Sequence, residues 1–109
     1  MVLLMITVWY PHDKSTNVAK KYIELNKKYP PDRSLGKTLV IGVTTSKEGI
    51  KVIALASVVK GKFEEALALQ STFQREFAQG IEGYKYKIET LMDITEAYAT
   101  VDMKAPEDR

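Results

Sequence analysis

The centre of the chain holds two runs rich in β-branched residues, GKTLVIGVTTS at 36–46 and GIKVIALASVV at 49–59. A short polar connection from Ser46 to Gly49 joins them. Runs of this composition form strands, and a connection of a few residues that ends in glycine suits a hairpin. We therefore expect the two runs to pair antiparallel, and the rest of the chain must supply the elements that cover this hairpin.

The segments on either side of the hairpin show two different periods. Residues 2–10 are apolar in both alternating sets, as in a strand covered on both faces, and residues 84–90 alternate between large and charged side chains. Helical stripes of mostly apolar residues lie between these strands and the hairpin: Val18, Tyr22, Leu25 and Tyr29, then Phe63, Ala66, Leu67, Gln70, Phe73 and Phe77. Asp93 and Glu96 have the spacing of a capping box, which predicts a short helix through Tyr98.

The resulting order is strand, helix, strand, strand, helix, strand, with a short C-terminal helix. This order predicts an α+β class fold, the ferredoxin-like βαββαβ arrangement, in which both helices cover one face of a four-stranded antiparallel sheet. A chain of 109 residues is enough for one hydrophobic core. We expect a single domain over residues 1–103, followed by a tail at 104–109.

One face of this sheet needs a further cover. The first and third expected strands, 2–10 and 50–59, carry apolar side chains on both faces, yet the two helices can cover only one. A wide apolar face left in water is an aggregation liability. A second copy of the chain is the simplest cover, because a two-fold dimer needs only one self-complementary surface. We therefore expect a homodimer or a larger even oligomer.

The element order and the doubly apolar central strands resemble those of the dimeric α+β barrel superfamily. The resemblance covers nearly the whole chain and implies two ferredoxin-like subunits packed sheet to sheet, with pockets between the open sheet face and the helices. That superfamily includes cofactor-independent monooxygenases, isomerases, haem-degrading enzymes and many uncharacterised proteins. The second helical segment, KFEEALALQSTFQREFAQG, contains no histidine, so the axial ligand of the haem-binding branches has no candidate there and we expect no cofactor.

The stretch VWYPHDKST at residues 8–16 places the only tryptophan and the only histidine at the corner between the first strand and the first helix. Pro11 ends the strand, and Asp13 or Ser15 is expected to accept the free amide hydrogens of the helix. Histidine is the commonest general base in enzymes, which makes His12 a candidate catalytic residue. The alternative is that His12 is an exposed loop residue without a catalytic role.

Aromatic and apolar residues near this corner form a second candidate site. Met5, Thr7 and Trp9 share one alternating set of the first strand, which we assign to the uncovered sheet face. Tyr84 and Tyr86 lie on the strand expected beside it, so all five are candidate walls of a cleft for a small molecule. For Trp9 the alternative is an anchor in the dimer interface, since aromatic residues are enriched in both settings.

Composition excludes several other classes of function. The formal net charge is +2 without a sustained basic run, so nucleic acid is not an expected partner. The chain has no cysteine, and one histidine with scattered carboxylates lacks the ligand clustering of a metal site. The apolar segment MVLLMITVWYP is interrupted at Pro11, far short of the roughly 20 residues that span a membrane. We expect no membrane partner and a cytoplasmic location.

These observations lead to three hypotheses about function. The first is a small dimeric protein that binds a small apolar or aromatic molecule in a cleft at the sheet face. The second is a cofactor-independent monooxygenase or isomerase with His12 as its base. The third is a structural protein whose exposed strand edges and terminal helix extend dimers into larger assemblies.

Overall fold

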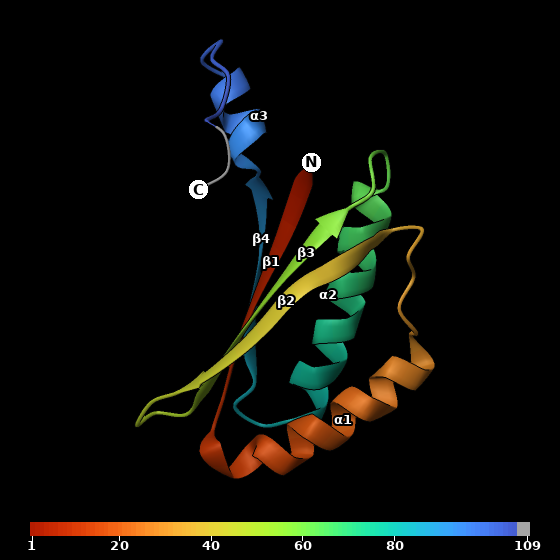
Figure 1. The fold of residues 1–109 in the computed structure, drawn as a ribbon. Helices are drawn as coiled ribbons and strands as arrows, with labels where there is room; N and C mark the ends of the chain where they lie inside the picture. The colour runs from red at the N-terminus through yellow and green to blue at the C-terminus, as the bar shows by residue number, and fades with distance from the viewer. Residues whose placement is uncertain (107–109) are drawn as a thin grey trace.

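The computed structural model describes residues 1–106 and contains one four-stranded antiparallel sheet with α1 and α2 on the same side of it (Figure 1). In chain order the elements are β1 (Val2–Tyr10), a single 3₁₀ turn (His12–Lys14), α1 (Ser15–Lys28), β2 (Gly36–Thr45), β3 (Ile50–Val58), α2 (Phe63–Gly80), β4 (Lys85–Met92) and α3 (Ile94–Ala99). The predicted element order and the α+β class are therefore confirmed.

The strands lie in the order β2-β3-β1-β4, and every neighbouring pair is antiparallel. The central strand β1 places Ile6 opposite Ala54 of β3 and Ile88 of β4. The predicted hairpin is the pair β2 and β3, closed by backbone hydrogen bonds between Ser46 and Gly49. Its register shifts once, at Leu39, where β2 carries one extra residue as in a β-bulge.

The core lies between one face of the sheet and the two long helices. Its buried side chains include Leu4, Ile6 and Val8 of β1, Val58 of β3, Leu25 of α1, and Ala66 and Phe77 of α2. We call this side of the sheet the helix face. Because successive strand residues point to opposite faces, residues 3, 5, 7 and 9 of β1 point away from the helices.

We call the opposite side the open face. Residues that pair directly across antiparallel strands share a face, so the register fixes its composition. Its members are Leu3, Met5, Thr7 and Trp9 of β1, Lys51, Ile53, Leu55 and Ser57 of β3, Lys37, Val40, Gly42 and Thr44 of β2, and Lys85, Lys87, Glu89 and Leu91 of β4. Its centre is apolar and its β4 edge is charged.

The start of α1 differs from the prediction. The residue before the helix is Lys14, and neither Asp13 nor Ser15 accepts a hydrogen bond from the first helical turn. The 3₁₀ turn runs directly into α1, and the backbone N–H of Ser15, the first residue of the helix, donates to the carbonyl oxygen of His12 in the turn. The Ser15 hydroxyl is a donor instead, to the carbonyl oxygen of His12 at 3.0 Å.

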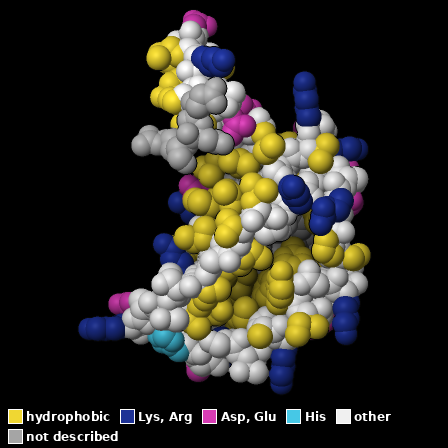
Figure 2. All heavy atoms as spheres, in the orientation of Figure 1, with side chains coloured by type: hydrophobic (Ala, Val, Ile, Leu, Met, Phe, Trp, Pro, Cys, Tyr) yellow, Lys and Arg dark blue, Asp and Glu magenta, His cyan; other side chains and the backbone are white. Residues whose placement is uncertain are grey.

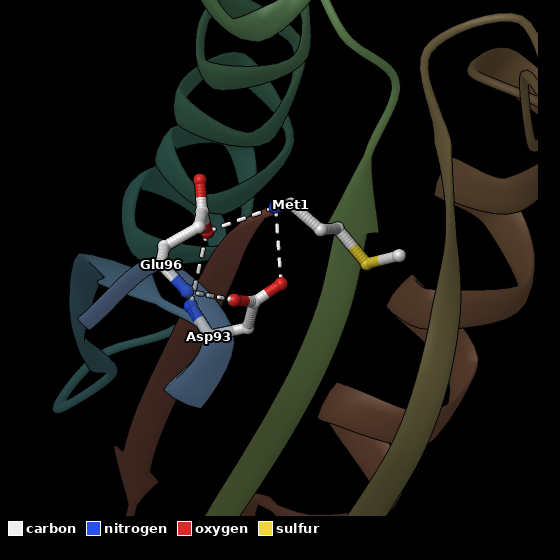
Figure 3. Close-up of polar contacts among 3 residues, drawn as sticks. All are labelled: Met1, Asp93 and Glu96. Atoms are coloured by element: carbon white, nitrogen blue, oxygen red, sulfur yellow. Dashed lines mark hydrogen bonds and ion pairs between the residues drawn. The ribbon is translucent and has the colours of Figure 1, made fainter. Parts of the chain in front are cut away.

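The C-terminal helix α3 lies beyond the end of the sheet, away from α1 and α2 (Figure 1). The predicted capping box is confirmed: Glu96 N donates to Asp93 Oδ1 at 2.8 Å, and Asp93 N donates to Glu96 Oε1 at 3.1 Å. The amino group of Met1 lies 3.0 Å from Asp93 Oδ2 and 2.9 Å from Glu96 Oε1 (Figure 3). We call these three residues the terminal clamp, since they join the first residue of the chain to α3.

The expected tail at 104–109 is described only in part. Residues 104–106 carry no helix or strand, and residues 107–109 lie outside the described residues.

Candidate functional site

A cavity of about 380 Å³ lies between the helix face and the two long helices. Figure 2 shows it as a hollow lined with hydrophobic side chains. The sheet contributes Leu4, Ile6, Ala54 and Ala56 as its floor. One wall is Ala66, Leu69, Gln70, Phe73 and Gln74 of α2, and the other is Tyr22 and Asn26 of α1 with Tyr29 just after that helix. Residues 30–33 also line it. We call it the helix-side cavity. Its size falls within the range of about 300–1,000 Å³ that is common for small-molecule sites.

Short side chains on the sheet create this space. Ala54 and Ala56 lie on the helix face of β3, where leucine or isoleucine would fill the gap below α2. The wall from α2 is a single helix face, because residues 66, 69, 70, 73 and 74 recur at three- and four-residue spacing. Phe73 meets Tyr22 of α1 edge to face, with ring centroids 6.3 Å apart, which joins the two helices beside the cavity.

The mouth of the cavity is formed by the loop between α1 and β2. Asp32 holds this loop in shape: its Oδ1 accepts hydrogen bonds from the hydroxyl and the backbone N–H of Ser34. These donors lower the pKa of the Asp32 carboxyl, so it stays ionised and engaged. Arg33 and Lys37 are exposed cations at the same mouth. The exposed lining therefore combines these polar groups with the apolar side chains of Tyr22 and Ile41.

A buried polar pair lies behind the α2 wall. The hydroxyl of Tyr84 donates a hydrogen bond of 2.5 Å to Oε1 of Gln74. The Tyr84 ring stacks on Phe77 with centroids 5.0 Å apart, and on its other side it stacks on Tyr10 at 6.3 Å. Burial raises the pKa of Tyr84 well above its ordinary value, so the hydroxyl keeps its proton. Tyr84 therefore acts as the donor in this pair.

The structure separates the five residues expected to line one cleft. Met5, Thr7 and Trp9 lie together on the open face. Tyr84 belongs to the core on the helix face, and Tyr86 pairs with Val8, whose side chain is also on the helix face. Lys85 is the β4 residue that pairs with Trp9. The open face thus offers Trp9 a charged neighbour on β4 in place of a tyrosine.

A smaller hollow of about 170 Å³ lies beside Trp9. It is lined by Trp9, Thr44, Thr45, Ser46, Glu48, Gly49, Ile50 and Lys51, which belong mainly to the β2–β3 hairpin. It is less than half the size of the helix-side cavity. The larger apolar site is therefore on the opposite side of the sheet from the predicted cleft.

His12 is exposed, and its ring contacts the hairpin rather than either hollow. Its Nε2 lies 2.6 Å from the carbonyl oxygen of Ser46. A carbonyl oxygen only accepts hydrogen bonds, so this contact requires the proton on Nε2. Only Nδ1 is then left with a lone pair, and the catalytic role of His12 stays a prediction.

Sequence reasoning did not find the helix-side cavity, although two signals for it were present. Gln70 interrupts an otherwise apolar helical stripe, and Gln74 lies one turn further along the same face. Ala54 and Ala56 are the smallest side chains of an otherwise bulky strand pattern. Polar residues on a core-facing helix, opposite small residues on a strand, are the pattern that would have pointed to a pocket.

Residues 1–106 contain neither a membrane-spanning helix nor a cluster of metal-ligating side chains. None of the helices in this part of the chain has both the length and the apolar character needed to cross a bilayer. In the same residues no group of three or more potential metal-ligating side chains comes together.

No family model matches the chain, and no curated protein matches it. Two solved structures are similar in fold. A de novo designed protein, Foldit4, has a TM-score of 0.57 and 15% sequence identity, over 84% of this chain and 97% of that one. A dimeric ferredoxin-like protein from an uncultured marine organism has a TM-score of 0.55 and 16% identity, over 85% of this chain and 94% of that one. The chain therefore has a ferredoxin-like fold, similar to that of a dimeric protein of known structure.

Proposed function

We propose that the protein binds a small apolar or aromatic molecule in the helix-side cavity. The observation that carries this proposal is the cavity of about 380 Å³ itself, with its apolar floor and walls. An apolar cavity of about 150 Å³ already binds benzene in a well-studied protein. A space more than twice as large suits a molecule of two fused or linked rings.

The chemistry of the walls supports an aromatic ligand. Phe73 and Tyr22 present ring edges and faces at the junction of α1 and α2. Aromatic pairs gain about 0.5–1.5 kcal/mol beyond the burial of their area, so these rings favour another flat ring over an aliphatic chain. The few polar groups of the lining, such as Asn26 and Gln70, would set orientation.

The test uses naphthalene as the probe and a variant that fills the cavity. Ala54→Leu adds volume to the floor, and Ala68→Leu makes the same change on the exposed side of α2. Binding is followed by the chemical shifts of protein methyl groups during titration. We expect wild type and Ala68→Leu to bind naphthalene and Ala54→Leu to lose at least tenfold in affinity. Equal binding by all three proteins, or none by wild type, would refute the proposal.

We further propose that the open face pairs with a second copy of the chain. Trp9 and Ile53 are each 38% exposed there and Val40 is 57% exposed, so the centre of this face is apolar and open to solvent. The similar ferredoxin-like protein is described as dimeric, which supports the same use of the fold here. In this proposal Met5, Thr7 and Trp9 form an interface, and the ligand occupies the other side of the sheet.

A further inference from the structure

Gln74 is the least expected residue of the helix-side cavity. It is 7% exposed and lies on the α2 wall beside Phe73, in a cavity whose lining is mostly apolar. A primary amide has one acceptor oxygen and two N–H donors, and burying these groups without partners is unfavourable. The partners of the two ends of this side chain therefore show what the site is suited to bind.

The oxygen end of the amide is already satisfied. The Tyr84 hydroxyl donates to Oε1, and Tyr84 stacks between Tyr10 and Phe77 on the side of the wall that does not line the cavity. Because burial keeps the phenol protonated, Tyr84 has a proton to donate and the amide presents its oxygen to it. This contact orients the Gln74 amide so that its oxygen faces Tyr84 and its nitrogen does not.

Gln74 lines the cavity, and its nitrogen end has no partner among the described residues. Within residues 1–106, Nε2 of Gln74 donates a hydrogen bond to no protein atom, and this nitrogen keeps some accessible surface. An N–H donor in an apolar cavity favours an acceptor atom on whatever occupies that cavity. Among the described residues that line the cavity, the cations are Arg33 and Lys37, and neither belongs to the α2 wall, so an anionic group beside Gln74 is not favoured.

We propose that Gln74 selects an apolar ligand that carries a neutral hydrogen-bond acceptor, such as the carbonyl oxygen of an aromatic ketone. The proposal rests on the proposed function, since it names the class of molecule that the helix-side cavity takes. The amide N–H groups donate to the ligand carbonyl while Tyr84 holds the amide oxygen. Gln74 is thus a residue that determines specificity, and Tyr84 is the residue that positions it.

The experiment compares benzophenone with diphenylmethane, which differ in a carbonyl group against a methylene group between the same two rings. Affinities are measured by calorimetric titration or by displacement of naphthalene. We expect wild type to bind benzophenone about tenfold more tightly, as one net hydrogen bond of about 1.4 kcal/mol provides. The side-chain ¹⁵N–¹H signals of Gln74 should shift with benzophenone more than with diphenylmethane.

Three variants distinguish the effect of losing the Gln74 amide from the effect of disturbing the fold. Gln74→Leu is made in a Tyr84→Phe background, so that no buried hydroxyl is left without an acceptor, and it should bind both compounds with similar affinity. Gln79→Leu removes an exposed amide of the same helix outside the cavity and should keep the preference of wild type. The single variant Tyr84→Phe frees the amide to rotate and should reduce the preference.

The outcomes distinguish the two proposals. Equal affinity of wild type for both compounds would overturn the role of Gln74 and leave the binding function standing. A preference that survives in the Gln74→Leu, Tyr84→Phe protein would overturn it as well. Failure of wild type to bind naphthalene, benzophenone and diphenylmethane would overturn both the function and the specificity. A preference present in wild type and absent without the amide supports the inference.

Discussion

Nε2 of His12 and the carbonyl oxygen of Ser46 lie 2.6 Å apart, although 34 residues separate them in the chain. This hydrogen bond connects the corner between β1 and α1 to the tip of the β2–β3 hairpin. The only histidine of the chain thus lies where two segments distant in sequence meet. Its observed contact is structural, and it holds the hairpin against the start of α1.

Replacing His12 should therefore change stability rather than ligand binding. His12→Ala removes the hydrogen bond to Ser46, and we expect the free energy of unfolding to fall by about 0.5–1 kcal/mol, a modest loss because the contact is exposed. Urea denaturation measures the change, and Asn17→Ala, an exposed position early in α1, is the control. Unchanged stability, or loss of naphthalene binding in a folded His12→Ala protein, would contradict this role.

The terminal clamp should make the attachment of α3 depend on pH. Hydrogen bonds from Glu96 N and from the Met1 amino group lower the pKa of the Asp93 carboxyl, so its stabilising contribution is lost as pH falls through that lowered value. Contacts with Glu96 and Asp93 raise the pKa of the Met1 amino group, so its contribution is lost as pH rises through the raised value. The attachment should be strongest between these limits.

Backbone chemical shifts of Ile94–Ala99, followed from acid to alkaline pH, measure this dependence. Asp93→Asn keeps a side-chain oxygen for the helix cap but removes the charge, so it should keep α3 helical while weakening its link to Met1. Shifts in wild type that do not change at either end of the pH range would contradict the role of the clamp.

A charge placed on the open face should prevent self-association. Ile53→Lys puts an ammonium group at the centre of that face, where pairing with a second copy would bury it. Val43→Lys is the matched control, because Val43 is 65% exposed on β2 but points to the other side of the sheet. Sedimentation equilibrium should give a dimer for wild type and Val43→Lys and a monomer for Ile53→Lys. A wild-type monomer at all concentrations would refute the interface.

The same measurement addresses extended assembly. If strand edges or α3 joined dimers into chains, the mass of wild type would rise continuously with concentration. A single mass over a wide concentration range excludes that behaviour and agrees with a closed pair.

Much of the fold could be predicted because local patterns and global packing agree. The alternation in 84–90, the hairpin around Ser46–Gly49 and the capping box at Asp93 each depend on residues close in sequence. The element order then leaves few topologies, and the observed strand order is the one expected for a ferredoxin-like sheet. Met5, Thr7 and Trp9 lie on one face because strand residues alternate strictly between faces, which the sequence alone shows.

The candidate site could not be predicted in the same way, because it depends on distances between elements. The alternation of side chains along β4 shows which residues share a face with Tyr86, but it does not show which face of the sheet this is. Only the register with β1 shows that Tyr86 lies on the face of Val8 and not on that of Trp9. The position of Tyr84, just before β4, is set by its stacking on Phe77 and its bond to Gln74. The size of the helix-side cavity likewise depends on the separation of α1, α2 and β3, and the sequence signals at Gln70, Gln74, Ala54 and Ala56 indicate its place but not that separation.

The central claim is that a small apolar molecule binds between the helices and the sheet rather than on the open face. Titration of methyl-labelled protein with naphthalene tests it most directly, because methyl groups line both sides of the sheet. We predict shifts at Leu4, Ile41 and Leu69, which line the helix-side cavity, and none at Leu55 of the open face. Shifts centred on Leu55 and its neighbours, or no shifts at saturating naphthalene, would contradict the claim.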